Sequence, residues 1–358
     1  MKSRFSASDN GNAEIKKAQI NNTAIVLTNL GSPDEPKAKA LKVYLREFLS
    51  DPRVVEIPRL IWLFILNGII LNIRPKKSAK LYEKVWLEDG SPLVSMAESQ
   101  TKKIADLIAQ RFPDTEKQTY HVEVAMRYGN PSIKDVLTKL QNDNINDIIL
   151  LPLYPQYASP TTGSTFDALS KVLQKWRYVP NVQFINGYHT NSTYIKALAS
   201  SIREHVEMVG KPDKLVLSYH GMPELFRKNG DPYYEFCEQT TTLVKHELLN
   251  HAEGFALAAE DFVMTFQSRF GNAQWLTPYT DVTLEELAKQ GHKNIAIISP
   301  AFSADCLETL EELEDENREI FMDAGGETYH YIAALNDRDD HIEAILDVLT
   351  PAIKSMAK

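Results

Sequence analysis

The sequence predicts an α/β protein with two four-stranded parallel sheets, each flanked by helices. Three observations support this fold class: eight short runs rich in β-branched residues, amphipathic stretches between these runs, and a turn motif that occurs twice. Strands that alternate with helices form parallel sheets covered on both faces and joined by right-handed crossovers. At 358 residues the chain is too long for one small core and suits two domains of ordinary size.

The expected strands form two sets of four. They are short runs of Val, Ile, Leu and aromatic residues, which are typical of strands buried on both faces. The first set covers residues 23–30, 121–128, 147–155 and 182–188, and the second covers residues 214–221, 262–268, 294–302 and 328–335.

A repeated turn supports the division into two similar halves. "MRYGN" at residues 126–130 ends the second strand of the first half, and "SRFGN" at residues 268–272 ends the second strand of the other half. Each turn is followed by a helix and then by an apolar strand that ends in proline and an aromatic residue. We infer a duplicated α/β unit, with a ligand cleft between its halves at the carboxyl ends of the strands.

Four segments are expected along the chain. Residues 1–22 are polar and lack the apolar core of a signal peptide, so we interpret them as a flexible leader. An N-terminal domain at residues 23–190, a C-terminal domain at residues 191–338 and a closing helix at residues 339–358 follow. Because no export signal is recognised, the expected location is the cytoplasm.

The composition is that of a globular protein, with 43% hydrophobic and 24% charged residues. The net charge of −9 argues against a general nucleic-acid binder, because such proteins usually present a basic face. Two cysteines occur, Cys237 and Cys306, without a pairing pattern. Neither a disulfide framework nor an all-cysteine metal site is therefore supported.

The most apolar window of the chain is residues 57–73. Arg59, Asn67 and Gly68 interrupt it, and it is shorter than the ~20 apolar residues that a membrane-spanning helix needs. We expect this window to form either a buried helix or an exposed apolar surface, here called the lip, that contacts an apolar ligand or a bilayer.

Two features at the expected strand ends can carry chemistry. His220 directly follows an apolar strand and precedes Gly221, so its imidazole is expected on the ligand side of the sheet. The loop at residues 159–165 is rich in hydroxyl groups and contains a glycine. Its backbone N–H groups can hold an anion, although helix capping and turn formation explain the same hydroxyls.

Asp305, Glu308, Glu312 and Glu316 fall on one side of an expected α-helix, which turns by about 100° per residue. A solvated helix face explains such acids in general, and the helix dipole favours the first two. If the stripe faces His220, one imidazole and several carboxylates form a ligand set for ferrous iron, cobalt or zinc. The same groups can also pass protons to solvent.

Nine segments, in order, resemble the ferrochelatase family, whose members insert ferrous iron into protoporphyrin to make protohaem. They are "LTNLGSPDEP", "LREFLSDPRVVEIPR", "DGSPL", "MRYGNPS", "LPLYPQYASPTTGST", "LSYHGMPE", "GDPYYEFC", "FQSRFGNAQWLTPYT" and "SPAFSADCLETLEEL". The resemblance covers about residues 23–336 and implies two Rossmann-like domains with the porphyrin held between them. It also matches residues 57–73 to an apolar lip that can touch the membrane.

The resemblance implies roles for particular residues. His220 matches the family's active-site histidine, which either accepts a pyrrole proton or ligates the metal, and Glu308 matches its partner carboxylate. The acidic path implied beyond them consists of Asp305, Glu312 and Glu316. The implied porphyrin-binding residues are Arg74, Tyr82 and Ser91 at the propionates, Arg127 and Tyr128 on the metal side, and Leu30 and Phe266 near the pocket.

The chemistry of the reaction agrees with these roles. Two N–H protons must leave a free-base porphyrin as the metal enters, so the site needs a base and a proton exit, which His220 and the acidic stripe can supply. The two substrate carboxylates need donors such as Arg74, Tyr82 and Ser91. A rigid cleft that bends the macrocycle toward its transition-state shape lowers the barrier.

The resemblance also sets expectations for cofactors, partners and location. No tightly bound cofactor is expected, because ferrous iron and protoporphyrin IX are substrates, and two cysteines exclude the four-cysteine iron–sulfur cluster of some members. Leu30 and Phe266 stand where some relatives have methionine and tryptophan. We expect a cytoplasmic enzyme that contacts the inner membrane peripherally through residues 57–73 and binds no nucleic acid.

Three alternatives remain open at this point. The substrate can be coproporphyrin, or a corrin precursor that receives cobalt. A porphyrin or haem carrier would bind in the same cleft without chemistry, but it gives no reason for an acidic stripe opposite His220. A periplasmic solute-binding protein has a similar two-lobed layout, but it needs an export signal.

Overall fold

The computed structural model describes residues 5, 21–251, 257–271 and 273–357. Contacts divide the chain into two compact units. The first unit contains the described residues up to Leu153, Ser159–Gly187 and the residues from Ile345 onward, and the second contains Tyr154–Ala158 and Tyr188–Ala344. The leader expected at residues 1–22 lies almost wholly outside the described residues, and the expected domain boundary at residue 190 stays a prediction.

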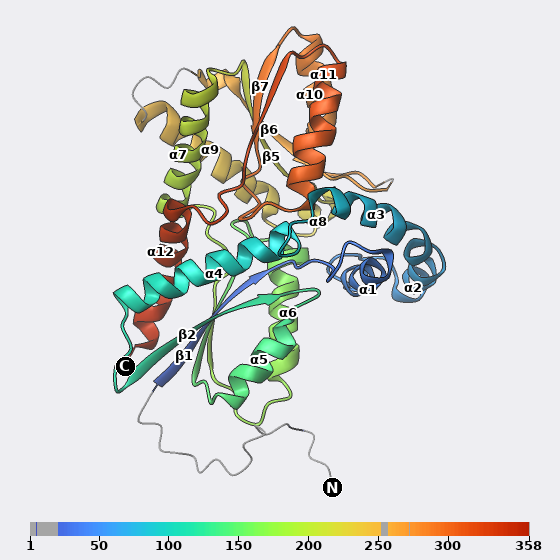
Figure 1. Ribbon diagram of the computed structural model, residues 1–358. Coiled ribbons are helices and arrows are strands. Elements are labelled where there is room, and N and C mark those ends of the chain that lie inside the picture. Colours follow the sequence, from blue (N-terminus) through green and yellow to red (C-terminus); the bar gives the residue numbers. More distant parts are fainter. Residues whose placement is uncertain (1–4, 6–20, 252–256, 272, 358) are drawn as a thin grey trace. The chain divides into compact units, whose positions relative to one another are not determined.

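The first unit contains one sheet and the helices that cover it (Figure 1). Its elements are β1 (Asn21–Asn29), α1 (Ala38–Leu49), α2 (Arg59–Ile65), the π-helix η1 (Leu66–Ile70), α3 (Leu71–Val85), α4 (Pro92–Arg111), β2 (Gln118–Met126), α5 (Ile133–Asn142), β3 (Asp147–Pro152), the π-helix η2 (Ser159–Gly163), α6 (Ser164–Leu173) and β4 (Asn181–Phe184).

The second unit repeats this pattern of strands and helices. Its elements are α7 (Ser192–Val209), β5 (Lys214–His220), α8 (Glu224–Lys228), α9 (Tyr233–His251), the 3₁₀-helix η3 (Ala259–Asp261), β6 (Phe262–Gln267), α10 (Thr280–Lys289), β7 (Asn294–Ile298), the π-helix η4 (Glu308–Glu316), α11 (Asn317–Asp323) and β8 (Thr328–Ile332). The helix α12 (Asp339–Met356) follows β8 along the chain.

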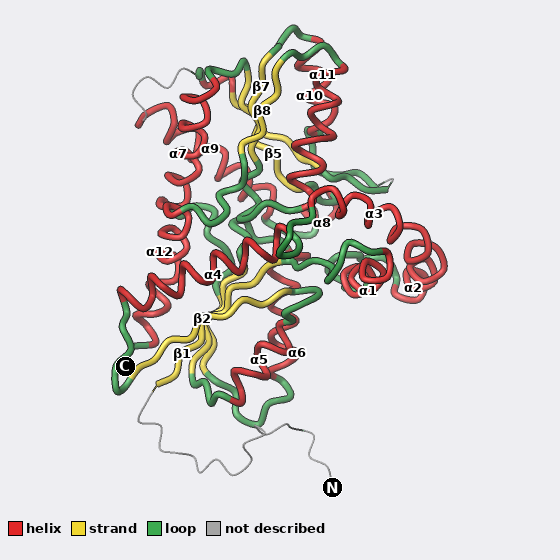
Figure 2. Tube along the Cα trace, in the orientation of Figure 1, coloured by secondary structure: helices red, strands yellow, loops and turns green. Residues whose placement is uncertain are grey.

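Both sheets are parallel throughout and have the same strand order. Figure 2 shows their strands in yellow. The first is ordered β2-β1-β3-β4 and the second β6-β5-β7-β8, so the first strand of each set lies inside its sheet and the second lies at an edge. The fold class predicted from the sequence is confirmed. Several strands end earlier than expected; β7, for example, ends at Ile298, two residues before Pro300.

The strands are apolar because both faces of each sheet are covered. Ala24, Ile25, Val26 and Leu27 of β1 are all fully buried. Helices α5 and α6 pack against one face of the first sheet, and α10 and α11 pack in the same way in the second unit. Continuous burial of this kind is expected for parallel strands between helices, and it leaves only the ends of the sheet for chemistry.

Short polar side chains fix where several helices begin. Ser91, Ser132 and Asn191 each accept a hydrogen bond from a backbone N–H in the first turn of α4, α5 and α7. Pro92 follows Ser91 at the first position of α4, where a missing N–H costs nothing. The side chain of Ser91 therefore caps α4 and lies at the start of this helix.

The apolar window at residues 57–73 forms α2, η1 and the start of α3. Trp62 and Leu66 on its inner side are buried in a cluster that also contains Tyr128. Leu60 and Phe64 on its outer side are 77% and 82% exposed. The window is therefore both a buried helix and an exposed apolar surface, and no helix in the described part of the chain is long and apolar enough to span a bilayer.

Candidate active site

His220 is the last residue of β5 and lies opposite Gln267 of β6 in the sheet. Its Nδ1 lies 2.6 Å from the carbonyl oxygen of Gly221. Because a carbonyl oxygen can only accept, Nδ1 carries the proton in this arrangement and Nε2 of the neutral ring keeps its lone pair. The half-buried imidazole is therefore suited to accept a proton or bind a metal ion through Nε2.

Gly221 is required where the chain turns after His220. Its N–H donates to the carbonyl oxygen of Gln267 over 2.7 Å. A Cβ atom on Gly221 would lie 2.5 Å from that same oxygen, closer than side chains approach backbone atoms. Glycine thus allows the strand to turn while it is still bonded to β6, which fixes the position of the preceding histidine.

The acids that follow β7 lie on a π-helix, η4, rather than on the expected α-helix. The hydrogen bonds of a π-helix join residues five apart, so Glu308, Glu312 and Glu316, which are four residues apart, still lie on nearly the same side of the helix. The amide Nε2 of Gln267 donates to the carbonyl oxygen of Glu308 over 2.9 Å. Gln267 therefore links the start of η4 to the strand end that carries His220.

Glu312 is bound by a residue that the sequence did not indicate. The backbone N–H of Ser268 donates to Oε1 of Glu312 over 2.6 Å, and the hydroxyl of Ser268 donates to Oε2. Burial, together with the charges of Glu308 and Glu316, raises the pKa of Glu312 to about 7, although both bonds from Ser268 lower it. Glu312 can therefore bind or release a proton near neutral pH.

Asp305 lies before η4 and is enclosed by donors. Its Oδ1 accepts from the hydroxyls of Thr309 and Tyr331 over 2.9 and 2.5 Å, and its Oδ2 accepts from Nδ2 of Asn336 over 2.7 Å. These bonds hold the turn that begins η4 against the segment after β8. Asp305 is therefore buried and holds the turn in place, which differs from its expected position on an acidic helix face. Glu316, at the other end of η4, is exposed.

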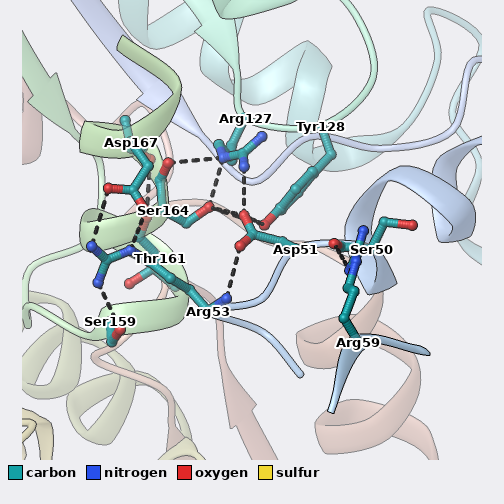
Figure 3. Close-up of polar contacts among 11 residues, drawn as sticks. Ser50, Asp51, Arg53, Arg59, Arg127, Tyr128, Ser159, Thr161, Ser164 and Asp167 are labelled. Atoms are coloured by element: carbon teal, nitrogen blue, oxygen red, sulfur yellow. Dashed lines mark hydrogen bonds and ion pairs between the residues drawn. The ribbon is translucent and has the colours of Figure 1, made fainter. Parts of the chain in front are cut away.

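Arg127 and Tyr128 follow β2 in the first unit, where their N–H groups donate to the carbonyls of Asn29 and Leu30. Their side chains converge on Asp51, which the sequence did not indicate (Figure 3). The Tyr128 hydroxyl donates to Oδ2 of Asp51 over 2.9 Å, and Arg127 forms an ion pair with the same oxygen. The aromatic ring of Tyr128 also lies under the guanidinium of Arg127, at 4.3 Å.

Two close backbone approaches fix this strand end. A Cβ atom on Gly31 would lie 1.8 Å from the carbonyl oxygen of Tyr128, and one on Gly129 would lie 2.4 Å from the carbonyl oxygen of Ser32. Both glycines also have positive φ angles, +97° and +75°. Glycine is needed at both positions so that the loop after β1 can lie directly against Tyr128.

The hydroxyl-rich loop at residues 159–165 uses its side chains within the protein. Ser159 accepts from Arg53 over 3.0 Å, Ser164 donates to Asp51 over 2.6 Å, and Thr165 donates to the carbonyl of Thr161 over 3.0 Å. Only the Thr165 contact is local, because Arg53 and Asp51 lie more than 100 residues from Ser159 and Ser164 in the sequence. Neither anion binding nor capping therefore accounts for the loop as a whole, and several of its hydroxyls instead tie it to the segment around Asp51.

The remaining predicted residues lie on several elements. Arg74 and Tyr82 are on α3, and burial lowers the pKa of Arg74. Leu30 packs on the edge of the cluster around Tyr128. Phe266 lies in the interior of the second unit and stacks on Tyr234 at 5.6 Å between ring centroids. Among the described residues, no three His, Cys, Asp or Glu side chains are grouped so that they can hold a metal ion.

Comparison with known proteins identifies the family. The family model described as ferrochelatase matches residues 22–352. The chain is 53% identical over 332 residues to ferrochelatase of Shewanella denitrificans, covering 92% of this chain and 98% of the relative. It is 54% identical over 327 residues to ferrochelatase 2 of Shewanella oneidensis, covering 91% and 96%.

A solved structure shows the same fold at low sequence identity. SirB from Bacillus subtilis with Fe3+ aligns over 94% of this chain and 96% of its own, with a TM-score of 0.54 and 9% identity. At this identity the likeness concerns the fold alone. The match of the family model and the close relatives show that the chain belongs to the ferrochelatase family.

Proposed function

We propose that the chain inserts ferrous iron into protoporphyrin IX, releases two protons and forms protohaem in the last step of haem biosynthesis. As a member of the ferrochelatase family it is a metal chelatase of the lyase class, which inserts iron into a porphyrin for haem synthesis. The observation that carries the residue assignment is the sheet edge of the second unit, where Gln267 joins the strand of His220 to the acids of η4.

Proton removal is assigned to His220 and Glu308. Nε2 of His220 has a lone pair because Nδ1 donates to the Gly221 carbonyl, so it accepts a pyrrole proton or ligates the incoming iron. Glu308 is the neighbouring carboxylate at the start of η4, available to the metal or to the proton. Both residues are therefore proposed as catalytic and as metal-site residues.

Proton release to solvent is assigned to the acids deeper in η4. The pKa of about 7 at Glu312 allows this carboxyl to be protonated and deprotonated within one turnover near neutral pH. Glu316, one step further along, is exposed, so it can pass the proton to water. The role proposed for Asp305 is to hold the first turn of this path in place.

The residues proposed to bind the porphyrin come from both units, and each has its own chemical role. A guanidinium that has lost part of its hydration gains most by binding an anion, which supports Arg74 as a partner of a propionate. Tyr82 and Ser91 add hydroxyl donors, although the Ser91 oxygen also accepts from Val94 in the cap of α4. Arg127 and Tyr128 are proposed on the metal side, and Leu30 and Phe266 as apolar neighbours.

Peripheral membrane contact through residues 57–73 belongs to the same proposal. Leu60 and Phe64 expose apolar side chains on α2, and the exposed Lys76, Lys77 and Lys80 follow on α3. Apolar groups beside cations suit the surface of an anionic bilayer, even though the whole chain carries a charge of −9. An apolar substrate such as protoporphyrin, with two carboxylates, partitions to the same surface.

The proposal is tested by anaerobic mixing of the purified protein with protoporphyrin and ferrous iron, followed by absorbance and porphyrin fluorescence. We expect multiple turnovers for the wild type and for His121→Ala, which changes an exposed histidine of β2, and none for His220→Ala. Stoichiometric porphyrin binding without metal insertion would favour a carrier. Turnover of coproporphyrin but not protoporphyrin would change the substrate and keep the reaction class.

A further inference from the structure

Asp51 is a buried carboxylate that receives donors from several elements of the first unit. It lies in the turn after α1 and is 7% exposed. Its Oδ1 accepts from the N–H of Arg53 over 2.8 Å, and its Oδ2 accepts from Ser164 at the start of α6 over 2.6 Å. Arg127 and Tyr128, which follow β2, donate to the same Oδ2.

The charge of this carboxylate is stabilised by its neighbours. Burial by itself raises the pKa of Asp51, but the hydrogen bonds from Ser164, the Arg53 N–H and Tyr128, with the charge of Arg127, lower it overall. The Asp51 carboxylate is therefore ionised at neutral pH. Because arginine side chains keep their positive charge in proteins, the buried pair contains one negative and one positive charge.

The contacts of Arg127 leave one part of its guanidinium available. Nε donates to the hydroxyl and carbonyl of Ser164 over 2.6 and 3.0 Å, and Nη2 pairs with Asp51. Within the described residues Nη1 has no hydrogen-bond partner in the protein, and in Figure 3 the third nitrogen of Arg127 points away from Asp51. The side chain is 17% exposed, so a substrate can reach it.

We propose that Asp51 is a positioning residue, whose carboxylate fixes Arg127 and Tyr128 and balances the charge of Arg127 where the divalent metal substrate approaches. The inference rests on the proposed function, which assigns Arg127 and Tyr128 to the metal side of the porphyrin. An uncompensated guanidinium repels a dication, and this repulsion is strong where little water screens it. When Asp51 is ionised, the pair of Arg127 and Asp51 has no net charge and does not repel the metal, and Nη1 of Arg127 can still donate a hydrogen bond.

The exposed ion pair of Arg53 and Asp167 provides a matched control at the same edge of the sheet. Arg53 donates to Asp167 and to Ser159, so this pair ties the loop of Asp51 to η2 and α6 (Figure 3). Asp167→Asn changes the charge by the same amount as Asp51→Asn, but it does so in solvent and without contact to Arg127.

The test measures KM for the metal and for protoporphyrin separately, in the wild type and in Asp51→Asn. We expect the KM for ferrous iron, or zinc as a surrogate, to rise about tenfold, with less than a threefold change in the KM for protoporphyrin. The increase should shrink at high salt, because ions screen the unbalanced charge. Asp167→Asn should stay within about twofold of the wild type for both substrates.

Two further variants separate charge balance from packing. Ser164→Ala loosens the same network without changing its charge, so it should lower the melting temperature and raise the metal KM by much less than Asp51→Asn does, without dependence on salt. Asp51→Asn/Arg127→Gln removes both charges, so it should fold and return the metal KM toward the wild-type value, with reduced kcat. If Asp51→Asn alone is unfolded, this double variant decides, because a purely structural Asp51 predicts that it is unfolded too.

The two hypotheses fail in different ways. A wild-type protein that does not insert metal refutes the proposed function. If the wild type turns over normally, three results would refute only the role of Asp51. These are an unchanged metal KM in Asp51→Asn, an increase in that KM that does not depend on salt, and an equal increase in Ser164→Ala.

Discussion

Ser268 donates two hydrogen bonds to the carboxylate of Glu312, one from its backbone N–H and one from its hydroxyl. Ser268 directly follows β6 and has a positive φ of 62°, which is unusual for a residue other than glycine. This conformation directs both donors of one residue at a single acid of η4. The pKa of Glu312 therefore depends on a residue 44 positions away in the sequence.

Ser268→Gly should move the acidic limb of the pH–rate profile upward. Glycine accepts the positive φ and keeps the N–H donor, so the variant removes only the hydroxyl. A donor to the ionised carboxylate lowers its pKa, so its loss raises the pKa of Glu312 above about 7. We expect the limb in kcat/KM against pH to shift by about half a unit or more; an unchanged limb would show that Glu312 does not control it.

Glu308→Ala should abolish metal insertion while leaving porphyrin binding intact. General acid–base groups contribute about 100-fold or more, so turnover should fall at least that far. Fluorescence quenching should give a protoporphyrin affinity within about twofold of the wild type. Asp315→Ala, at an exposed position of the same π-helix, is the control. Normal turnover in Glu308→Ala would remove this residue from the mechanism.

His341 should make the protein less stable below neutral pH. Its side chain is fully buried, and burial lowers its pKa to about 4 from the usual 6.5. The folded state therefore favours the neutral ring, and the stability that this provides is complete above pH 6.5 and is lost as pH falls toward 4. The full effect is about 3 kcal/mol, because one pKa unit corresponds to about 1.4 kcal/mol.

Thermal melts between pH 4 and pH 8 check this prediction. Because carboxylates titrate in the same range, the slope of the melting temperature against pH is compared between the wild type and His341→Gln. The variant lacks the imidazole, so its curve should be flatter between pH 6.5 and pH 4. Parallel curves would mean that His341 is not the group responsible.

Phe64→Asp should weaken binding to anionic vesicles. Transfer of a large apolar side chain out of water is worth about 2 kcal/mol, which corresponds to roughly 30-fold in partitioning. Sedimentation with phosphatidylglycerol vesicles measures the effect, and phosphatidylcholine vesicles test the contribution of the lysines on α3. Val43→Asp changes another exposed apolar residue, on α1 and outside residues 57–73, and should bind as the wild type does. An equal loss of vesicle binding in both variants would exclude specific membrane contact through residues 57–73.

The strands could be predicted from the sequence because their pattern is local. Residues 294–298, for example, are apolar on both faces, which is typical of a strand covered by helices on both sides. The amphipathic stretches before and after such runs have the periodicity of helices with one buried face. The position of His220 also followed from its place directly after such a run. The π-helical form of η4 could not be predicted, because an acidic, leucine-containing segment suits an α-helix equally well.

The partners of the predicted residues were missed because they come from distant segments. Asp51 lies 76 positions before Arg127, and no periodicity connects a turn after one helix with the end of another strand. Asp305 was expected beside Glu308 on one helix face, but its bonds to Tyr331 and Asn336 depend on where β8 lies. A weak signal existed for Ser268, because it begins the repeated "SRFGN" turn.

Gln267 connects the two residues that are proposed to meet the metal, His220 and Glu308. Its backbone is paired with His220, its carbonyl accepts from Gly221, and its side chain donates to the first carbonyl of η4. The separation between the imidazole and the first acid is therefore set by the pairing of two strands, not by a loop that can adapt to its ligand. On the proposal that His220 and Glu308 hold the metal, divalent ions of different radius demand different separations of these two side chains. The tolerance of the enzyme for ions other than iron should then depend on how rigidly Gln267 holds them.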